Sequence, residues 1–317
     1  MPFISASDVR TIAVVGAGTI GSSWAAWFLA RGYTVRLTDP AANAEAHART
    51  YIRNAWPALV LIGVTTEDVD AALGRLSMHQ TAAEAAMGAD FVQENAPERA
   101  DIKRAVLKEI DAAVAPDKVI ASSTSGFGVT EMQAEMAHPE RLVVGHPFNP
   151  PHLIPLVEVV GGGVTSDDAV HWSIGFYRHV GKKAIHVRKE VPGHIANRLQ
   201  AALWREACYL VEEGVGSVED VDAAIAYGPG LRWAVMGPHL TFHLAGGRGG
   251  MGHFFDHLGP NVERWWESLG SPQITPQLRD VVVAGVNEEI GNRSFEQLVA
   301  ERDEKLLGVL AATADKT

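Results

Sequence analysis

The chain has 317 residues, of which 47% are hydrophobic and 21% charged, so it is long enough for about two domains with substantial cores. Its formal net charge of −11 argues against nucleic acid or an anionic membrane as a partner, because both attract basic surfaces. A single cysteine, Cys208, excludes an intrachain disulfide and is typical of a reducing compartment. The first residues (MPFISASDVR) show no export signal, and no apolar run is long enough to span a bilayer. We therefore expect a cytoplasmic protein that does not bind membranes.

Strand and helix patterns alternate through the first part of the chain. A buried strand is predicted at 11–18, a helix at 19–31 and a second strand at 34–39, followed by a helical pattern through the 40s and 50s. Further strands are predicted at 89–97, 119–125, 142–146, 153–161 and 182–189. This alternation is typical of an α/β fold with a doubly wound, mostly parallel sheet of Rossmann type.

The pattern changes near residues 189–193. From Pro192 onward the predicted segments are almost all helical, at 193–213, 217–227, 233–269 with breaks, 275–290 and 294–313. We predict a nucleotide-binding domain at residues 1–190 and an all-helical domain at 191–317.

The stretch GAGTIG (16–21) matches the G-x-G-x-x-G pattern of dinucleotide-binding turns and stands between a predicted strand and a predicted helix. Gly16 permits the tight turn, Gly18 lets a pyrophosphate approach the backbone, and Gly21 lets helix and strand pack closely. Thr19 and Ile20 begin the helix, whose N-terminus offers free N–H groups to phosphate oxygens.

Asp39 ends the next predicted strand, eighteen residues after Gly21. A carboxylate at this position accepts hydrogen bonds from the ribose hydroxyls and repels a 2′-phosphate, so the predicted cofactor is NAD in preference to NADP. The alternative is a glycine-rich turn without a ligand.

His146 and Glu158 are unusual residues for their positions in VVGHPFNPPHLIPLVEVVGGG (143–163). The histidine ends one predicted strand and the glutamate lies inside the next. Oxidation of an alcohol by NAD requires a base for the hydroxyl proton, and a histidine is suited to that role. A carboxylate partner would fix its tautomer and stabilise the imidazolium. The alternative is a structural histidine with a local salt bridge.

A series of motifs in the same order resembles the 3-hydroxyacyl-CoA dehydrogenase family: GAGTIG, QENAPE (93–98), SSTSG (122–126), GHPFNPP (145–151), LVEVV (156–160) and GHIANRL (193–199). The resemblance extends from residue 11 to about residue 200, and the helical second domain agrees with the layout of the family. It implies that His146 is the base, that Glu158 is its partner, and that the protein is a homodimer.

Other site residues follow from the resemblance alone. It implies that Ser125 hydrogen-bonds the substrate oxygen, that Asn197 helps to position the substrate, and that Glu94 and Asn95 lie in the loop that meets the cofactor. Taken singly, Ser125 reads as a turn hydroxyl and Asn197 as a polar residue at a helix start.

The composition of residues 41–88 bears on the substrate. This segment contains no lysine and three arginines against five acidic residues, so it disfavours the phosphates of coenzyme A. A small free 3-hydroxy acid fits better. The stretch GPGLRWAVMGP (228–238) resembles the branch of the family that oxidises L-carnitine and L-gulonate, and its RWAVMG together with AGGRGGMGHF (245–254) looks more like the enzymes that oxidise L-carnitine.

Arg232 and Trp233 are the candidate substrate-binding residues in the first of these stretches. A guanidinium binds a carboxylate through two parallel hydrogen bonds, and an aromatic face holds a trimethylammonium group. The alternatives are a surface arginine and an aromatic residue in the core or at a dimer interface.

Two histidine pairs, His239/His243 and His253/His257, have the i, i+4 spacing of zinc ligands on a helix. The predicted reaction needs no Lewis acid, so we expect no metal.

The predicted activity is NAD-dependent oxidation of the 3-hydroxyl of a small L-3-hydroxy acid, with L-carnitine as the first candidate. L-gulonate, a 3-hydroxyacyl-CoA ester and a non-catalytic NAD-binding role follow as alternatives.

Overall fold

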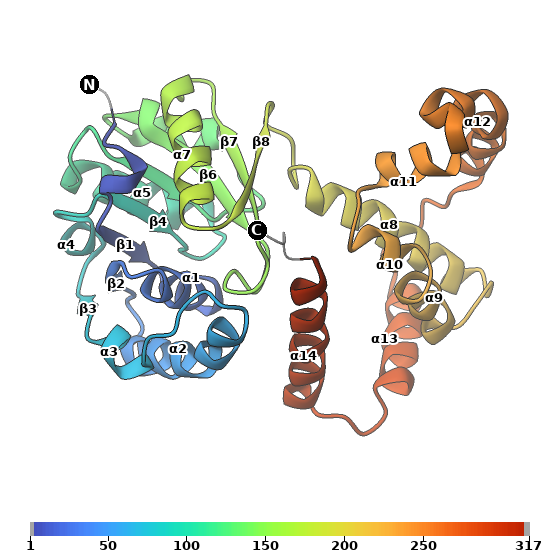
Figure 1. The fold of residues 1–317 in the computed structure, drawn as a ribbon, viewed down its shortest axis with the longest axis horizontal. Helices are drawn as coiled ribbons and strands as arrows, with labels where there is room; N and C mark the ends of the chain where they lie inside the picture. Colours follow the sequence, from blue (N-terminus) through green and yellow to red (C-terminus); the bar gives the residue numbers. More distant parts are fainter. Residues whose placement is uncertain (1–2, 314–317) are drawn as a thin grey trace. The chain divides into compact units, whose positions relative to one another are not determined.

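The computed structural model describes residues 3–313, and the chain divides between Ala196 and Asn197 into two compact units (Figure 1). The predicted domain boundary at residues 190 and 191 lies in the segment that joins the last strand of the first unit to the first helix of the second. Among the described residues no helix is both long and apolar enough to cross a membrane.

The first unit contains an eight-stranded sheet in the order β3-β2-β1-β4-β5-β6-β7-β8. The strands are β1 (Thr11–Val15), β2 (Thr34–Thr38), β3 (Leu76–His79), β4 (Phe91–Glu94), β5 (Val119–Ser122), β6 (Leu142–Pro147), β7 (Leu156–Gly161) and β8 (Lys183–Val187). Strands β1 to β6 are parallel, whereas β7 runs antiparallel to β6 and parallel to β8. The predicted doubly wound, mostly parallel sheet is therefore confirmed.

Helices cover both faces of this sheet, as Figure 1 shows. One core lies under α1 (Thr19–Ala30), α2 (Ala44–Leu61), α3 (Val69–Leu73) and α7 (Asp167–His179), and it includes Trp24, Phe28, Phe91 and Phe176. The opposite core lies under α4 (Ala82–Ala86), α5 (Ala100–Ala113) and α6 (Val129–Met132). Strands that are buried on both faces are apolar along most of their length. For this reason the apolar runs at the start of β6 and through β1 predict strands from the sequence.

Strand β3 has no counterpart among the predicted strands. It contains the four residues LSMH at the edge of the sheet, and Leu76 is the one buried residue among the four. Because an edge strand has fewer neighbours and its polar residues meet solvent, no apolar run marks it in the sequence.

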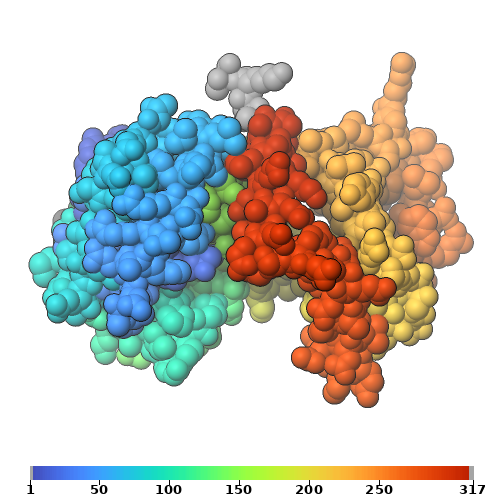
Figure 2. Space-filling model, turned by 90° about the horizontal axis from the view of Figure 1, so that it is seen from below, coloured from blue at the N-terminus to red at the C-terminus, as the bar shows by residue number. Residues whose placement is uncertain are grey.

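The second unit is helical. It contains most of α8 (Ala196–Glu212), then α9 (Val218–Ala226), α10 (Pro229–Trp233), α11 (Pro238–Ala245), α12 (Gly250–Ser268), α13 (Pro276–Ile290) and α14 (Phe295–Thr313). A capping box formed by Ser217 and Asp220 begins α9, at the start of the helical segment predicted at 217–227. In the space-filling view α13 and α14, drawn orange to red, form a bent arm (Figure 2). Helix α14 has no buried residue.

Candidate active site

The glycine-rich turn follows β1 directly and leads into α1. Gly16 has a φ of +94°, and a Cβ there would lie 2.6 Å from the carbonyl oxygen of Asn95. A Cβ on Gly21 would collide with the carbonyl oxygen of Gly16. Around Gly18 a Cβ would meet nothing within 4 Å, and no side chain caps the helix that begins after it. The turn therefore leaves open backbone, and the N–H groups of Gly18, Thr19 and Ile20 have no hydrogen-bond partner within residues 3–313, which suits a pyrophosphate.

Asp39 lies at the end of β2 beside this turn. Its Oδ2 accepts a hydrogen bond from the backbone N–H of Ala17 at 2.7 Å, and its Oδ1 accepts one from Ala41 at 2.9 Å. The carboxylate is thereby held at the rim of a cavity of about 260 Å³, which Gly16, Thr38 and Pro97 also line. Each oxygen keeps a lone pair for a ribose hydroxyl, so these residues fit the adenosine end of a dinucleotide.

His146 and Glu158 face one another across the β6–β7 pair. The antiparallel register places the two residues directly opposite, and Nδ1 of His146 lies 3.0 Å from Oε2 of Glu158. Glu158 is fully buried and His146 is 7% exposed. Since a carboxylate only accepts, Nδ1 carries the hydrogen and Nε2 of the neutral ring is left as a proton acceptor. No other hydrogen bond to this imidazole occurs within residues 3–313.

The second oxygen of Glu158 is also occupied. Its Oε1 accepts hydrogen bonds of 2.9 Å from the backbone N–H groups of Ile195 and Ala196, at the start of α8. Burial by itself would raise the pKa of Glu158, but the hydrogen bonds from His146, Ala196 and Ile195 outweigh burial and lower the pKa below its ordinary value. Glu158 is therefore an anion that holds both the imidazole of His146 and the start of α8.

His194 is a site residue that the sequence analysis missed. It is 4% exposed, and its ring centroid lies 5.2 Å from that of His146. Burial, with a further contribution from His146, lowers the pKa of His194 below its ordinary value, so the ring is neutral near pH 7. His194 lies inside the quoted GHIANRL motif, but nothing in a single sequence distinguishes it from a core histidine.

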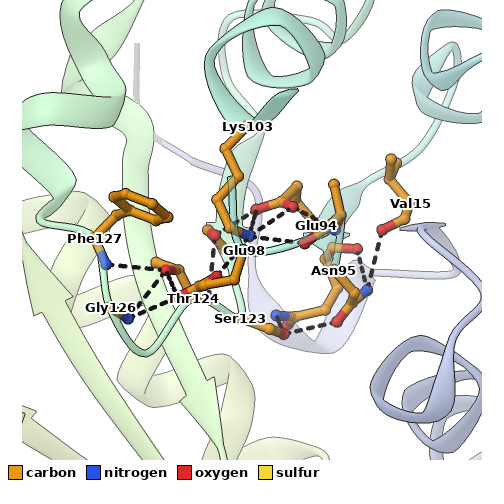
Figure 3. A network of polar contacts seen from close by, with 12 residues as sticks. Val15, Glu94, Asn95, Glu98, Lys103, Ser123, Thr124, Gly126 and Phe127 are labelled. Atoms are coloured by element: carbon orange, nitrogen blue, oxygen red, sulfur yellow. Dashed lines mark hydrogen bonds and ion pairs between the residues drawn. The ribbon is translucent and has the colours of Figure 1, made fainter. Parts of the chain in front are cut away.

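The loop that carries Ser125 follows β5 and is held by Glu98. Oε1 of Glu98 accepts hydrogen bonds from the Thr124 hydroxyl at 2.6 Å and from the N–H groups of Gly126 at 2.7 Å and Ser125 at 3.1 Å. Figure 3 shows Glu98 between this loop and Lys103, whose Nζ lies 3.4 Å from Oε2. Burial opposes ionisation, but the Thr124 hydrogen bond and the charge of Lys103 bring the pKa of Glu98 below its ordinary value.

The hydroxyl of Ser125 itself has no hydrogen-bond partner among the described residues. The backbone of its loop is fixed while its side chain is left open, which is the arrangement expected of a residue that binds a ligand. Glu98 belongs to the quoted QENAPE motif, yet only the tertiary structure connects it with the serine loop.

Glu94 and Asn95 have different surroundings. Glu94 is the last residue of β4 and fully buried, where its carboxylate accepts from Lys103 at 3.1 Å and from the hydroxyl of Ser122. Asn95 follows it beside the glycine turn; its side chain donates to the carbonyl of Gln93 and accepts from Ser123 at 2.7 Å (Figure 3). Both therefore join the β4 end to the β5 loop.

The remaining predicted residues belong to the helical unit. Asn197 is the second residue of α8 and follows Ala196, whose N–H is held by Glu158. Arg232 and Trp233 end the short helix α10, where both side chains are exposed.

The arginines of residues 41–88 are all paired with carboxylates. Arg49 bonds Glu45 at 2.9 Å, Arg53 bonds Asp70 at 2.5 Å, and Arg75 binds both oxygens of Glu67. The charge of each of the three guanidinium groups is therefore already matched by a carboxylate, so these arginines give the segment no net positive charge to offer to a phosphate.

Comparison with known proteins identifies the family of the chain. The NAD binding domain of 3-hydroxyacyl-CoA dehydrogenase matches residues 11–191, and the C-terminal domain of the same enzyme matches residues 193–297. The chain belongs to the 3-hydroxyacyl-CoA dehydrogenase family. It is therefore an NAD-dependent dehydrogenase, and the predicted cofactor is confirmed.

Individual members of the family are similar over almost the whole chain. An L-carnitine dehydrogenase of Streptomyces coelicolor is 53% identical over 98% of this chain and 96% of the relative. An L-carnitine dehydrogenase of Pseudomonas putida is 47% identical over the same shares. The solved structure of 5-formyl-3-hydroxy-2-methylpyridine 4-carboxylic acid 5-dehydrogenase, described as an NAD⁺-dependent dismutase, has a TM-score of 0.84 and 34% identity, covering 98% of this chain and 100% of that one.

Proposed function

We propose that the chain oxidises the 3-hydroxyl of L-carnitine to give 3-dehydrocarnitine, with NAD as the oxidant. The observation that carries the proposal is the buried His146–Glu158 pair in a chain that is about half identical to curated L-carnitine dehydrogenases along its full length. In that pair Glu158 orients the ring of His146 so that Nε2 is free to accept a proton. The relatives indicate that the proton comes from the 3-hydroxyl of L-carnitine.

The proposed reaction assigns a role to each residue. Nε2 of His146 takes the hydroxyl proton, and Glu158 stabilises the resulting imidazolium through the 3.0 Å contact to Nδ1. Ser125 hydrogen-bonds the substrate oxygen as it becomes a carbonyl, and Asn197 helps to orient the substrate. NAD would be held by Gly16, Gly18, Thr19, Ile20, Gly21 and Asp39, with Glu94 and Asn95 beside it, and when bound it would supply the acceptor for the hydride of C3.

The rest of the substrate would be recognised from the helical unit. Arg232 binds the carboxylate of L-carnitine, and Trp233 contributes an aromatic face to its trimethylammonium group. The paired arginines between residues 41 and 88 argue against coenzyme A esters as the preferred substrates. We assign residues 1–190 to NAD binding and residues 191–317 to substrate binding and dimerisation.

A homodimer is supported by the large apolar side chains that the helical unit exposes, such as Trp265 at 65% and Trp266 at 63%. Light scattering should give twice the chain mass of 34.0 kDa, and a monomer at micromolar concentration would contradict this part of the proposal.

The single cysteine supports a cytoplasmic location, which cell fractionation tests.

The substrate is tested by a screen of NADH formation. The purified protein is given NAD with L-carnitine, L-gulonate, 3-hydroxybutyrate or 3-hydroxybutyryl-CoA, and kcat/KM is measured for each. We expect L-carnitine to give the highest value. A higher value for the CoA ester would overturn the substrate assignment, and NAD binding without turnover of any compound would favour a non-catalytic role.

A further inference from the structure

One peptide unit in the serine loop is held at both of its polar ends. The carbonyl oxygen of Thr124 lies 3.3 Å from Nε2 of His194, and the N–H of the same peptide, which belongs to Ser125, donates to Glu98 at 3.1 Å. Thr124 is 1% exposed and its contact with His194 is buried, so water does not compete for that contact. With both ends held, the peptide plane cannot rotate, and the Cα of Ser125 is fixed with it.

The chemical state of His194 follows from its contacts. A carbonyl oxygen only accepts hydrogen bonds, so Nε2 must carry the hydrogen. Nδ1 is buried and has no hydrogen-bond partner in the structure. A proton on Nδ1 would leave a buried donor unsatisfied and would place a positive charge next to His146, although Glu158 and Glu98 partly offset that charge. His194 is therefore a neutral donor.

The backbone at His194 is unusual as well. Its φ of +49° lies in the left-handed region, which a residue with a Cβ adopts at a cost, and among residues 3–313 it is the one non-glycine residue with a positive φ. Glycine at position 193 already supplies one positive φ in this turn. A histidine kept in such a conformation beside a catalytic base suggests that its side chain is needed there.

We propose that His194 is a positioning residue for the reaction: by donating from Nε2 to the Thr124 carbonyl beside His146, it fixes the peptide before Ser125 and so sets the position of the serine hydroxyl on the substrate oxygen. The inference rests on the proposed function, because it takes Ser125 as the group that binds this oxygen. It adds a second histidine that works through hydrogen bonding and takes no proton.

Two substitutions of His194 test which of its two ring nitrogens is needed. The amide nitrogen of Gln occupies roughly the place of Nε2, whereas that of Asn occupies roughly the place of Nδ1 and does not reach Thr124. His194→Asn should lower kcat for L-carnitine by about 10- to 100-fold, since a displacement of about 1 Å costs that much in a positioned reaction. His194→Gln should restore most of the activity. Val191→Ala, in the same segment, is the control and should behave as the wild type.

A double variant with Ser125→Ala distinguishes a positioning role of His194 from a purely structural one. If His194 acts through the serine hydroxyl, His194→Asn should cost less than about twofold once that hydroxyl is absent. NAD dissociation constants and melting temperatures are measured for every variant, and both should stay close to wild type.

Equal losses from His194→Asn with and without the Ser125 hydroxyl would overturn the proposal, as would a folded His194→Gln protein that is as slow as His194→Asn. Should His194→Asn fail to fold, His194→Gln decides alone: near-wild-type kcat supports the proposal, and a loss above tenfold contradicts it. If the wild type does not oxidise L-carnitine, the proposed function fails first, and the same cycle is measured with whichever 3-hydroxy acid is oxidised.

Discussion

The two units of this chain bury their large side chains to very different extents. In the first unit Trp24, Phe28 and Phe91 are fully buried between the sheet and its helices. In the helical unit Trp204 is 55% exposed and Tyr227 80%. The first unit is therefore stabilised by its own core, whereas the second has apolar surface to offer to a substrate or a partner subunit.

In the proposed function, the residues for proton transfer and NAD binding lie in the first unit, and those that select the substrate lie in the second. The proposed base His146, its carboxylate partner Glu158 and the glycine-rich turn are held in the first unit by hydrogen bonds. The residues proposed to select the substrate stand on an exposed helix of the second unit. Substitutions in the first unit should therefore change kcat, and those in the second should change KM.

The largest effect is expected at the base. His146→Ala removes the proton acceptor and should lower kcat for L-carnitine by about 10²- to 10⁴-fold. NAD binding, measured by fluorescence titration, should be unchanged because the nucleotide turn is separate. Unchanged turnover would mean that another group takes the proton.

A comparable loss should follow from Glu158→Gln, for a different reason. The amide would donate to Nδ1 of His146 and force the hydrogen onto Nε2, which is then no longer a base; loss of the correct tautomer costs up to about 10⁴-fold in a catalytic triad. Measurement of kcat against pH tests this. Recovery of wild-type kcat near neutral pH would exclude the tautomer argument.

In the second unit, Arg232→Ala should raise the KM for L-carnitine by about 10- to 100-fold, since a hydrogen-bonded charged group is worth about 1.5–3 kcal/mol. kcat should change little. Arg279→Ala removes an exposed arginine of α13 and serves as the control. An effect of Arg232→Ala on kcat alone would place this residue in the chemical step instead.

Glu158 should also make the first unit sensitive to acid. Because its folded-state pKa lies below the ordinary value of 4.5, its charge stabilises the fold fully above pH 4.5, and that stability is lost as pH falls through the folded pKa. Wild type should exceed Glu158→Gln in unfolding free energy by about 1.5–3 kcal/mol at neutral pH. Urea titrations below pH 4.5 should show the difference shrinking; a constant difference would contradict the assignment.

The smallest effect is expected for Trp233→Leu. Loss of one aromatic face toward a trimethylammonium group costs about 0.5–2 kcal/mol, which is roughly a 2- to 30-fold increase in KM. Since 3-hydroxybutyrate has no such group, its KM should not change. Equal increases for both compounds would show that Trp233 contributes general packing.

The sequence alone was sufficient to predict structure where that structure depends on residues close together in the chain. GAGTIG is a local motif whose turn, helix start and packing are decided within a few residues, so Gly16, Gly18 and Gly21 occupy the positions expected of them. The doubly wound sheet was predictable because strands buried on both faces are unbroken apolar runs. The edge strand β3 was not, since one buried residue makes no run.

What the sequence determined by itself was a dinucleotide-binding turn, a histidine and a glutamate on successive strands, and a change to helices after residue 190. The tertiary structure decided that β7 runs antiparallel to β6 in the register that sets Glu158 opposite His146, because strand direction and register depend on sheet packing. It also decided that Glu98 and His194, far apart in the chain, hold the two ends of one peptide. Hydrogen bonds between distant segments leave no periodic pattern in a sequence, so only the folded chain reveals them.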